Sequence, residues 1–219
     1  MVTFNDIKHN EEIRTYIKMA DDSLSPMGFT EHGFAHVTRV MDVTEQILKK
    51  MGYDERTIEL AKISAYMHDI GNIVNRIDHA QSGAVMAFRL LTNLNMPAEE
   101  ISRIISAIGN HDESTAFPVN EIAAALILAD KSDVRRSRVR TKDHKAFDIH
   151  DRVNYAVEKS KLEIDTENKK FILHLNIDET MITISEYFEI FMNRMILCRR
   201  AARFFGYEFE IMHNKMRVM

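Results

Sequence analysis

The fold is decided by a stretch in the first third of the chain, residues 54–71, with the sequence DERTIELAKISAYMHDIG. Its apolar side chains recur at three- and four-residue spacing, which predicts an amphipathic helix that Asp54 can cap. Gly71 then ends this helix, because glycine readily takes the left-handed conformation found just past helix C-termini. His68 lies on the apolar stripe and points inward, with Asp69 beside it. A buried pair of this kind needs polar partners, which either a metal ion or, for the histidine, a backbone carbonyl could supply.

A second predicted helix, residues 30–50, brings two more histidines to the interior. Thr30 can cap this helix, and His36 falls on its apolar face near the N-terminal end. His32 lies one turn earlier on the same side, and two histidines four residues apart on a helix can bind one metal ion. His32 is therefore either such a ligand or an ordinary, partly exposed histidine.

Three further predicted helices carry a histidine or an aspartate near one end. His79 opens one helix, and His111 closes the isoleucine stripe of the next. Asp130 follows a run of apolar residues in the helix predicted over residues 121–134. A carboxylate in such a run is costly to bury unless it is paired or bound to a metal, so Asp130 joins the candidate ligands.

The order and the helical setting of these residues resemble the HD-domain superfamily of metal-dependent phosphohydrolases. The resemblance covers about residues 31–134, nearly half of the chain. It is carried by the segments EHGFAHVTRV (31–40), MHDIG (67–71), DHAQSGA (78–84), NHDE (110–113) and LADK (128–131). This likeness implies a bundle of helices that binds divalent metal.

The resemblance also implies which residues bind the metal. The minimal ligand set of the family corresponds here to His36, His68, Asp69 and Asp130. Members that hold two metals add two histidines, which correspond to His79 and His111, and the aspartate of the dyad bridges the two ions. One or two divalent ions are therefore expected for each chain. Mixed imidazole and carboxylate ligands suit Mn, Fe, Ni, Co or Zn better than an all-oxygen site would, and Mg is a further candidate.

Positive charge for a phosphate lies next to the expected ligands. Seven lysine or arginine residues occur within residues 131–145. Lys131 and Arg135 lie four residues apart on the same predicted helix, where both could reach a substrate phosphate. The expected substrate contacts are Lys131, Arg135, Arg76 and His32. From Arg138 onward the basic run is expected to be a solvated loop, and the pair His150-Asp151 is expected on the surface.

These residues support one main functional hypothesis and two alternatives. The main hypothesis is a phosphatase or phosphodiesterase that cleaves a nucleotide or another small phosphorylated metabolite, with His68 and Asp69 holding the metal that activates water. The first alternative is a di-iron oxygenase, because a minority of the superfamily, which resembles myo-inositol oxygenase, holds two irons with a similar ligand set. The third possibility is a non-catalytic, metal-binding regulatory module, because Asn72 stands where many members have lysine after His-Asp-Ile-Gly.

Composition narrows the class of protein. A net charge of -4 and a pI of about 6.2 argue against general nucleic-acid binding. The single cysteine, Cys198, cannot form an internal disulfide, which fits a reducing compartment, so we expect a cytoplasmic protein. The sequence contains no apolar stretch of membrane-spanning length and no signal-peptide core at its start. The expected partner is a small phosphorylated substrate rather than a membrane or a nucleic acid.

The last third of the chain changes character. After a helix near residues 148–159, alternating apolar residues predict a β-hairpin of strands 162–165 and 170–177. A long helix over residues 185–205 and a third strand follow. We expect a helical domain over residues 1–160, whose first helix covers residues 5–21, and a small α+β elaboration over residues 161–219 packed on it. The aromatic and methionine residues of the long helix are expected to be core or homodimer contacts rather than a cofactor site.

Overall fold

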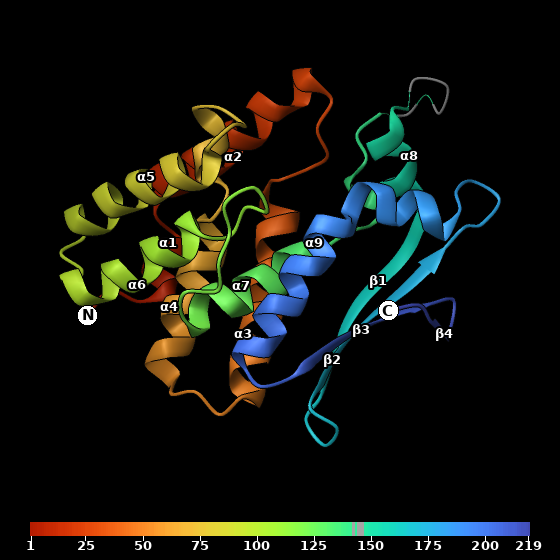
Figure 1. Cartoon of the computed structure of the whole chain (residues 1–219). Helices are drawn as coiled ribbons and strands as arrows, with labels where there is room; N and C mark the ends of the chain where they lie inside the picture. The colour runs from red at the N-terminus through yellow and green to blue at the C-terminus, as the bar shows by residue number, and fades with distance from the viewer. Residues whose placement is uncertain (142, 144–146) are drawn as a thin grey trace.

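The computed structural model describes residues 1–141, 143 and 147–219, and it places a small sheet beside a bundle of helices (Figure 1). The bundle contains α1 (Phe4–Lys8), α2 (Glu11–Leu24), α3 (Phe34–Lys50), α4 (Glu55–Met67), α5 (His79–Asn93), α6 (Ala98–Gly109) and α7 (Glu121–Lys131). Short 3-10 turns lie between them: η1 (Ser25–Met27), η2 (Ile70–Ile73) and η3 (Arg136–Arg138). The rest is α8 (Ile149–Ala156), β1 (Val157–Asp165), β2 (Lys170–Ile177), α9 (Ile184–Phe204), β3 (Glu208–His213) and β4 (Met216–Arg217). The predicted fold, mainly helical with a C-terminal α+β appendage, is confirmed.

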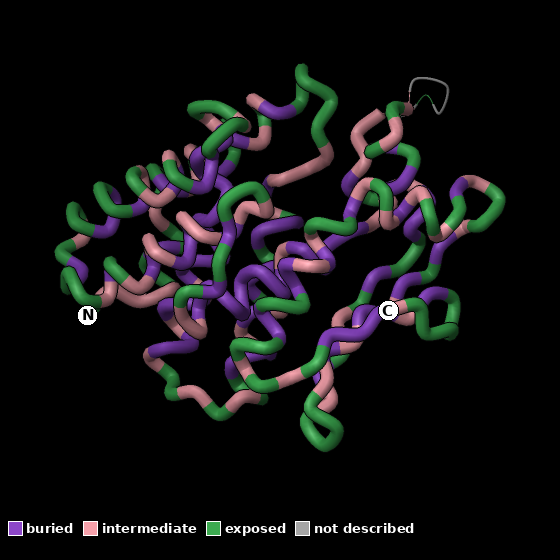
Figure 2. The backbone as a smooth tube through the Cα atoms, viewed as in Figure 1, coloured by how far each residue is buried: buried purple, intermediate pink, exposed green. Residues whose placement is uncertain are grey.

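The centre of the bundle is formed by α4 and α7, because both helices are apolar around most of their circumference. α7 is buried continuously from Ile122 to Ala129, and α4 packs against α3, α6 and α7. Figure 2 shows the buried part of the backbone concentrated in these inner helices. As predicted, Asp54 caps α4 by accepting a hydrogen bond from the backbone nitrogen of Thr57.

Two N-terminal helix boundaries differ from the prediction. The single helix expected over residues 5–21 is divided into α1 and α2, because Asn10 caps α2 by accepting a hydrogen bond from the Ile13 nitrogen. α3 begins at Phe34 with Gly33 as its N-cap, four residues later than expected. His32 therefore lies before the helix, and the expected helical pair of His32 with His36 is wrong.

Gly71 has a different role from the one expected. It lies inside η2 and its φ angle is not positive, so it is not a left-handed helix terminus. Instead η2 lies against the start of α5 so closely that a Cβ on Gly71 would overlap the carbonyl oxygen of His79 and lie 2.5 Å from the Gly83 nitrogen. Glycine is required here because two backbones meet, and this approach sets the position of His79 relative to the dyad.

The appendage is a four-stranded sheet with the order β1-β2-β3-β4. β1 and β2 form the expected antiparallel hairpin, although β1 begins earlier, at Val157. β2 and β3 pair in parallel, and the long helix α9 makes the crossover between them. α9 lies between the bundle and the sheet, in contact with α7 on one side and with β2 and β3 on the other (Figure 1). The division into two domains at residue 160 stays a prediction.

The long helix α9 divides its large side chains between interior and surface. Phe191 and Met195 are buried, as a core role requires, whereas Met192 and Phe204 are 41% and 42% exposed. Across the described parts of the chain, no helix has both the length and the apolar character needed to cross a bilayer.

Candidate metal centre

Asp69 occupies the middle of a cluster of buried imidazoles. It follows His68, the residue that caps the C-terminus of α4, and is only 4% exposed. Its Oδ2 lies 3.1 Å from Nε2 of His68 and 3.6 Å from Nε2 of His36. Its Oδ1 lies 3.4 Å from Nε2 of His79 and 3.7 Å from Nε2 of His111. The two oxygens of one carboxylate thus face two different pairs of histidines.

The first pair of histidines is completed by a second carboxylate. Asp130 comes from the C-terminal turn of α7, and its Oδ1 lies 3.2 Å from Nε2 of His36 and 3.8 Å from Nε2 of His68. The Nε2 atoms of His36 and His68 are both buried and lack a hydrogen-bond partner in the described structure. Since unpartnered buried polar atoms are costly, these two nitrogens have the surroundings expected of metal ligands.

The second pair consists of His79 and His111. His79 is the first residue of α5, and His111 follows the C-cap of α6, so two helix ends bring the rings together. Their Nε2 atoms are 3.2 Å apart, and both face Oδ1 of Asp69. Two imidazoles and one carboxylate oxygen make three donors, which is a common protein contribution to a metal site that keeps an open position.

Each of the four histidine rings is also held by a hydrogen bond at Nδ1, the nitrogen on the far side from the two carboxylates. Nδ1 of His36 donates to Oδ2 of Asp133 at 2.8 Å. Nδ1 of the other three donates to a backbone carbonyl: His68 to Ala65, His79 to Arg76 and His111 to Ile108. Because a carbonyl can only accept, Nδ1 carries the proton and Nε2 keeps its lone pair. This is the usual way in which an outer partner orients a metal-binding histidine.

The chemistry and spacing of this donor set fit divalent metal. Donors about 2.1 Å from one ion lie roughly 3 Å from each other, and the shorter separations in both halves are 3.1–3.4 Å. Side chains close enough to share an ion include His36, His68 and Asp130 on one side, and His68, Asp69 and His111 on the other. The residues named as ligands from the sequence therefore converge, with the carboxylate of Asp69 between two candidate positions.

The ionisation states at the site suit metal binding. Burial alone would raise the pKa of Asp69, but the neighbouring imidazoles, His68 foremost, hold that pKa well below its usual range. Burial likewise opposes ionisation of Asp130, yet Lys131 and His36 outweigh it and the pKa is again well below normal. Burial, and after it His111, lowers the pKa of His79 to about 4. Burial opposes ionisation of His68, but Asp69 and Asp130 outweigh it and raise the pKa of this imidazole. At neutral pH the cluster thus offers two carboxylates and, at His79, a neutral imidazole, the forms that bind metal, and a metal ion at His68 would replace its proton.

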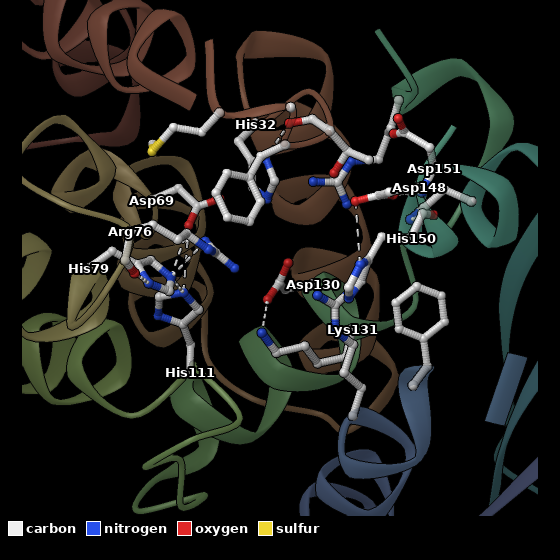
Figure 3. Close-up of a pocket in the computed structure, with 18 residues that line it drawn as sticks. His32, Asp69, Arg76, His79, His111, Asp130, Lys131, Asp148, His150 and Asp151 are labelled. Carbon is white, nitrogen blue, oxygen red and sulfur yellow. Dashed lines mark hydrogen bonds and ion pairs between the residues drawn. The ribbon is translucent and has the colours of Figure 1, made fainter. Parts of the chain in front are cut away.

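A cavity of about 340 Å³ opens onto this cluster (Figure 3). Asp69, His79, His111 and Asp130 form one wall of it. The rest of the lining comes from the loop after η1, from Arg76, Lys131 and Arg138, and from α8 and α9, so the C-terminal part of the chain helps to enclose the site. The cavity has the size of a small-metabolite site, and its lining mixes charged side chains with the rings of Phe29 and Phe191.

Three of the four expected substrate contacts line this cavity, namely His32, Arg76 and Lys131. Lys131 is buried and pairs with Oδ2 of Asp130 at 2.8 Å and with Oε2 of Glu113 at 2.7 Å. Arg76 donates to Oδ1 of Asn72 at 3.2 Å, and its guanidinium is 3.4 Å from Nε2 of His79. The ring of His32 lies 5.5 Å from that of His36, measured between centroids.

The structure places the fourth expected contact, Arg135, elsewhere. α7 ends at Lys131, so the prediction that Lys131 and Arg135 share a helix is wrong. Nε of Arg135 donates to Oδ1 of Asp133 at 2.8 Å, and the residue is not among those that line the cavity. Asp133 in turn binds His36, so Arg135 supports the site from outside.

Two arginines that line the cavity were not expected there. Arg138 is only 4% exposed and donates to the backbone oxygens of Glu31 and Asp133, so the prediction of a solvated loop is wrong at this residue. Arg194, on α9, donates to Oε1 of Glu113 at 2.8 Å. Neither has a sequence signal that separates it from a surface arginine, because only the fold brings these segments to the cavity. Lys142 and Lys145, in the same basic run, lie outside the described residues.

The pair His150-Asp151 also differs from its predicted surface position. Both residues line the cavity, together with Asp148 and Asn154 of the same segment. Asp151 is 6% exposed, whereas the side chain of His150 remains 63% exposed. The surface prediction is therefore wrong for Asp151, and His150 lies at the mouth of the site.

Asn72, which stands where many HD-domain proteins have lysine, contacts the dyad directly. Its side-chain nitrogen lies 3.0 Å from both the backbone oxygen and Oδ1 of Asp69. Its own oxygen accepts the hydrogen bond from Arg76. Asn72 thus links the bridging carboxylate to an arginine that lines the cavity, so a guanidinium is present close to the position of the missing lysine.

Comparisons with known proteins identify one matching family and two similar proteins. The family model described as HD domain matches residues 33–146, just over half of the chain. An uncharacterized protein of Methanocaldococcus jannaschii is 25% identical over 170 residues, covering 67% of this chain and 65% of that relative, so the chain spans slightly less than two thirds of the relative's length. The crystal structure of a predicted HD superfamily hydrolase from an uncultured Thermotogales bacterium matches with 26% identity and a TM-score of 0.46, covering 58% of this chain and 69% of that one.

Proposed function

Since the chain belongs to the HD domain family, a superfamily of metal-dependent hydrolases, we propose that it is a metal-dependent phosphohydrolase. Its substrate on this proposal is a phosphoester of a nucleotide or of another small phosphorylated metabolite. The observation that carries the proposal is the arrangement of Asp69, whose two oxygens face two separate groups of donors beside a cavity with four cationic side chains.

The residues proposed to hold the first ion are His36, His68, Asp69 and Asp130, and those proposed for the second are Asp69, His79 and His111. Bound ions of this kind supply a water that is nucleophilic at neutral pH and neutralise charge on phosphoryl oxygens. The protein contributes the fixed orientation of each ring and a carboxylate that belongs to both halves. His68 and Asp69 are on this basis the residues on which the reaction depends most.

Cationic side chains of the cavity are proposed to bind the phosphate. Arg76, Arg138 and Arg194 each use part of a guanidinium for internal hydrogen bonds, and a guanidinium has five donors, so donors remain for phosphate oxygens. Lys131 is already paired with Asp130 and Glu113. We therefore assign phosphate binding mainly to the arginines and assign Lys131 mainly to holding Asp130. The rings of Phe29 and Phe191 suit the organic part of the substrate.

The test begins with elemental analysis of protein purified without chelator, alongside the double variant His68→Ala, Asp69→Ala. The proposal expects about two transition-metal ions per chain, lost in the variant, and metal-dependent release of phosphate or alcohol from a panel of phosphoesters. Asp112→Asn is a matched control, because this aspartate also follows a histidine but bonds Ser114 instead of a ring of the cluster.

Each outcome of that test has a distinct meaning. Metal without turnover of any phosphoester would contradict the hydrolase and favour a regulatory module. Iron in both positions, together with oxygen consumption, would favour an oxygenase instead. One ion per chain would reassign His79 and His111 to substrate binding or to structure. Unchanged metal content in the double variant would place the metal elsewhere and overturn the proposed site.

A further inference from the structure

His150 lines the cavity from α8, across from the proposed metal ligands (Figure 3). It belongs to the first turn of α8 and lines the same cavity as Asp69 and Asp130. In Figure 3 its ring extends from α8 toward Asp130 and Lys131. His150 lies beyond residues 33–146, the part of the chain that matches the HD domain model. It is thus a feature that this chain adds to the site.

The carboxylate of Asp148 lies beside the ring of His150. Nδ1 lies 3.7 Å from Oδ2 of Asp148, an ion-pair distance rather than a short hydrogen bond. Asp148 is itself fixed, because its Oδ1 caps α8 by accepting a hydrogen bond from the Asp151 nitrogen at 2.7 Å. Since the carboxylate lies on the Nδ1 side, Nε2 is the ring nitrogen that can meet a substrate atom. The side chain is 63% exposed, so the ring can exchange protons with solvent.

Hydrolysis of a phosphoester whose leaving oxygen is strongly basic is accelerated by a proton donor. As the bond from phosphorus to the leaving oxygen breaks, negative charge develops on that oxygen, and a proton donor there lowers the barrier. The arginines of the cavity keep their protons at any physiological pH, and Lys131 is committed to Asp130 and Glu113. Histidine is the side chain whose ordinary pKa allows it to give and take a proton near neutrality.

We propose that His150, oriented by Asp148, is the general acid that protonates the leaving group, an inference that rests on the phosphohydrolase function proposed above. The water oxygen forms a bond to phosphorus, and the bond to the leaving oxygen breaks with its electron pair on that oxygen. The proton on Nε2 of His150 passes to the leaving oxygen, which departs as an alcohol. The proton lost by the water goes to solvent, and solvent returns a proton to the ring.

The direct test compares two leaving groups. p-Nitrophenolate leaves without help because it is a weak base, whereas phenolate benefits strongly from protonation. His150→Gln should slow hydrolysis of phenyl phosphate by about 10²-fold or more, the usual contribution of a general acid, and should slow p-nitrophenyl phosphate far less. If the phosphoester panel shows that only diesters are cleaved, the methyl diesters of the same two phenols replace them.

His174→Gln is the matched control for that variant. His174 is also a partly exposed histidine paired with a carboxylate, with Nε2 2.7 Å from Oε2 of Glu163. It lies on β2 and is not among the residues that line the cavity. This variant should hydrolyse both esters at the wild-type rate, and metal content should be unchanged in it and in His150→Gln.

Asp148→Asn tests the orienting role separately from folding. Asparagine is as good an N-cap as aspartate, so α8 keeps its start while the ring of His150 loses its negative partner. The substitution should then slow hydrolysis of phenyl phosphate more than that of p-nitrophenyl phosphate, in the same sense as His150→Gln but by a smaller factor. Other charged groups that line the cavity around His150 stay in place: Asp151 on α8, Arg138 on η3, Arg194 on α9 and Lys131 and Asp130 on α7.

A measurement without turnover completes the test. In zinc-loaded protein, which is diamagnetic, titration with inorganic phosphate should shift the imidazole NMR signals of His150 and leave those of His174 in place. If phosphate left the His150 signals unchanged, the ring would be too far from the reacting group, and the inference would be overturned.

Failure of this inference differs from failure of the function. If His150→Gln slowed hydrolysis of both esters by the same factor, His150 would have a binding or structural role. The general-acid assignment would then be wrong, while the proposed phosphohydrolase function would stand. A wild-type protein that carries metal but hydrolyses neither ester class would contradict the phosphohydrolase itself, and the role of His150 would fall with it.

Discussion

His79 and His111 share one carboxylate oxygen, Oδ1 of Asp69, which separates their half of the site from the half built around Asp130. Removing His79 should therefore empty one position and leave the other. We expect His79→Ala to bind about one ion per chain where the wild type binds about two, because the remaining half keeps four side chains. Elemental analysis and titration with a metal-sensitive dye would measure this.

The geometry predicts that each single substitution reduces metal binding at one position and spares the other. His36→Ala is the reciprocal variant, since its Nε2 lies 3.2 Å from Asp130 and Nδ1 is held by Asp133. It should weaken the first position and leave the second. If His79→Ala lost all metal, the two positions would form one cooperative unit, and the assignment of separate ligand sets would be wrong.

At the scale of single residues, the sequence predicts the candidate ligands that point inward, but it does not predict the charged residues that surround and orient them. His36 and His68 fall on apolar stripes, so burial follows from helical periodicity. Asp133 lies 97 positions from His36 in the chain, and nothing local marks it as the partner of that ring. Arg138 and Arg194 reach the cavity by the same kind of long-range packing. Local pattern therefore identifies candidate ligands, whereas the tertiary fold decides which charged residues surround them.

At the scale of elements, the contact between η2 and α5 sets the distance between the dyad and the second pair of histidines. We expect Gly71→Ala to destabilise the protein by roughly 3 kcal/mol, because the added Cβ would overlap backbone atoms that cannot rotate away. For a chain of this length that corresponds to a fall in Tm of roughly 6–12 °C. Thermal unfolding with chelator present measures it without a contribution from metal.

Gly109→Ala is the comparison for Gly71→Ala. A Cβ on Gly109 would meet only the Cβ of Ala84, at 3.7 Å, which is ordinary contact. Alanine is also a better helix former than glycine, so this variant should be neutral or slightly more stable. Equal effects of the two substitutions would show that the loss at Gly71 comes from glycine flexibility in general and not from the close approach.

The boundaries of the elements show where local sequence is informative. The capping side chain of Asp54, whose oxygen accepts from Thr57, marks the start of α4 in the sequence, whereas the cap at Asn10 lies inside a region predicted as one helix. α3 begins after Gly33, which has no side chain to mark the start, and the prediction placed it at Thr30. The position of His32 followed that error. The parallel pairing of β2 with β3 is likewise set by the crossover through α9 and not by any local pattern.

At the scale of the whole molecule, the appendage is connected to the candidate metal centre by a chain of charges. Arg194 of α9 pairs with Glu113, Glu113 pairs with Lys131, and Lys131 pairs with Asp130. Every contact in this series is 2.7–2.8 Å. The C-terminal third of the chain therefore helps to place Asp130, so its packing and the metal site should respond together.

We expect Arg194→Met to lower the free energy of unfolding by about 1–3 kcal/mol, because it leaves a largely buried carboxylate with one partner fewer. Glu113→Gln should be costly for the same reason, since it leaves two cations without their carboxylate. The double variant should cost less than the sum of the two, and a double-mutant cycle by chemical denaturation of metal-free protein would measure this coupling.

The pair Arg152–Glu186 gives the comparison, because its arginine side chain is 45% exposed where that of Arg194 is 25% exposed. Its nitrogen and oxygen are 2.6 Å apart, but the two side chains are 45% and 28% exposed, so Arg152→Met should change stability little. Arg194→Met should in addition weaken the affinity of the first metal position, because Lys131, once Glu113 has lost its other partner, is drawn away from Asp130. Additive stabilities together with unchanged metal affinity would mean that α9 encloses the cavity without positioning the ligand, and the link from the appendage to the metal centre would be refuted.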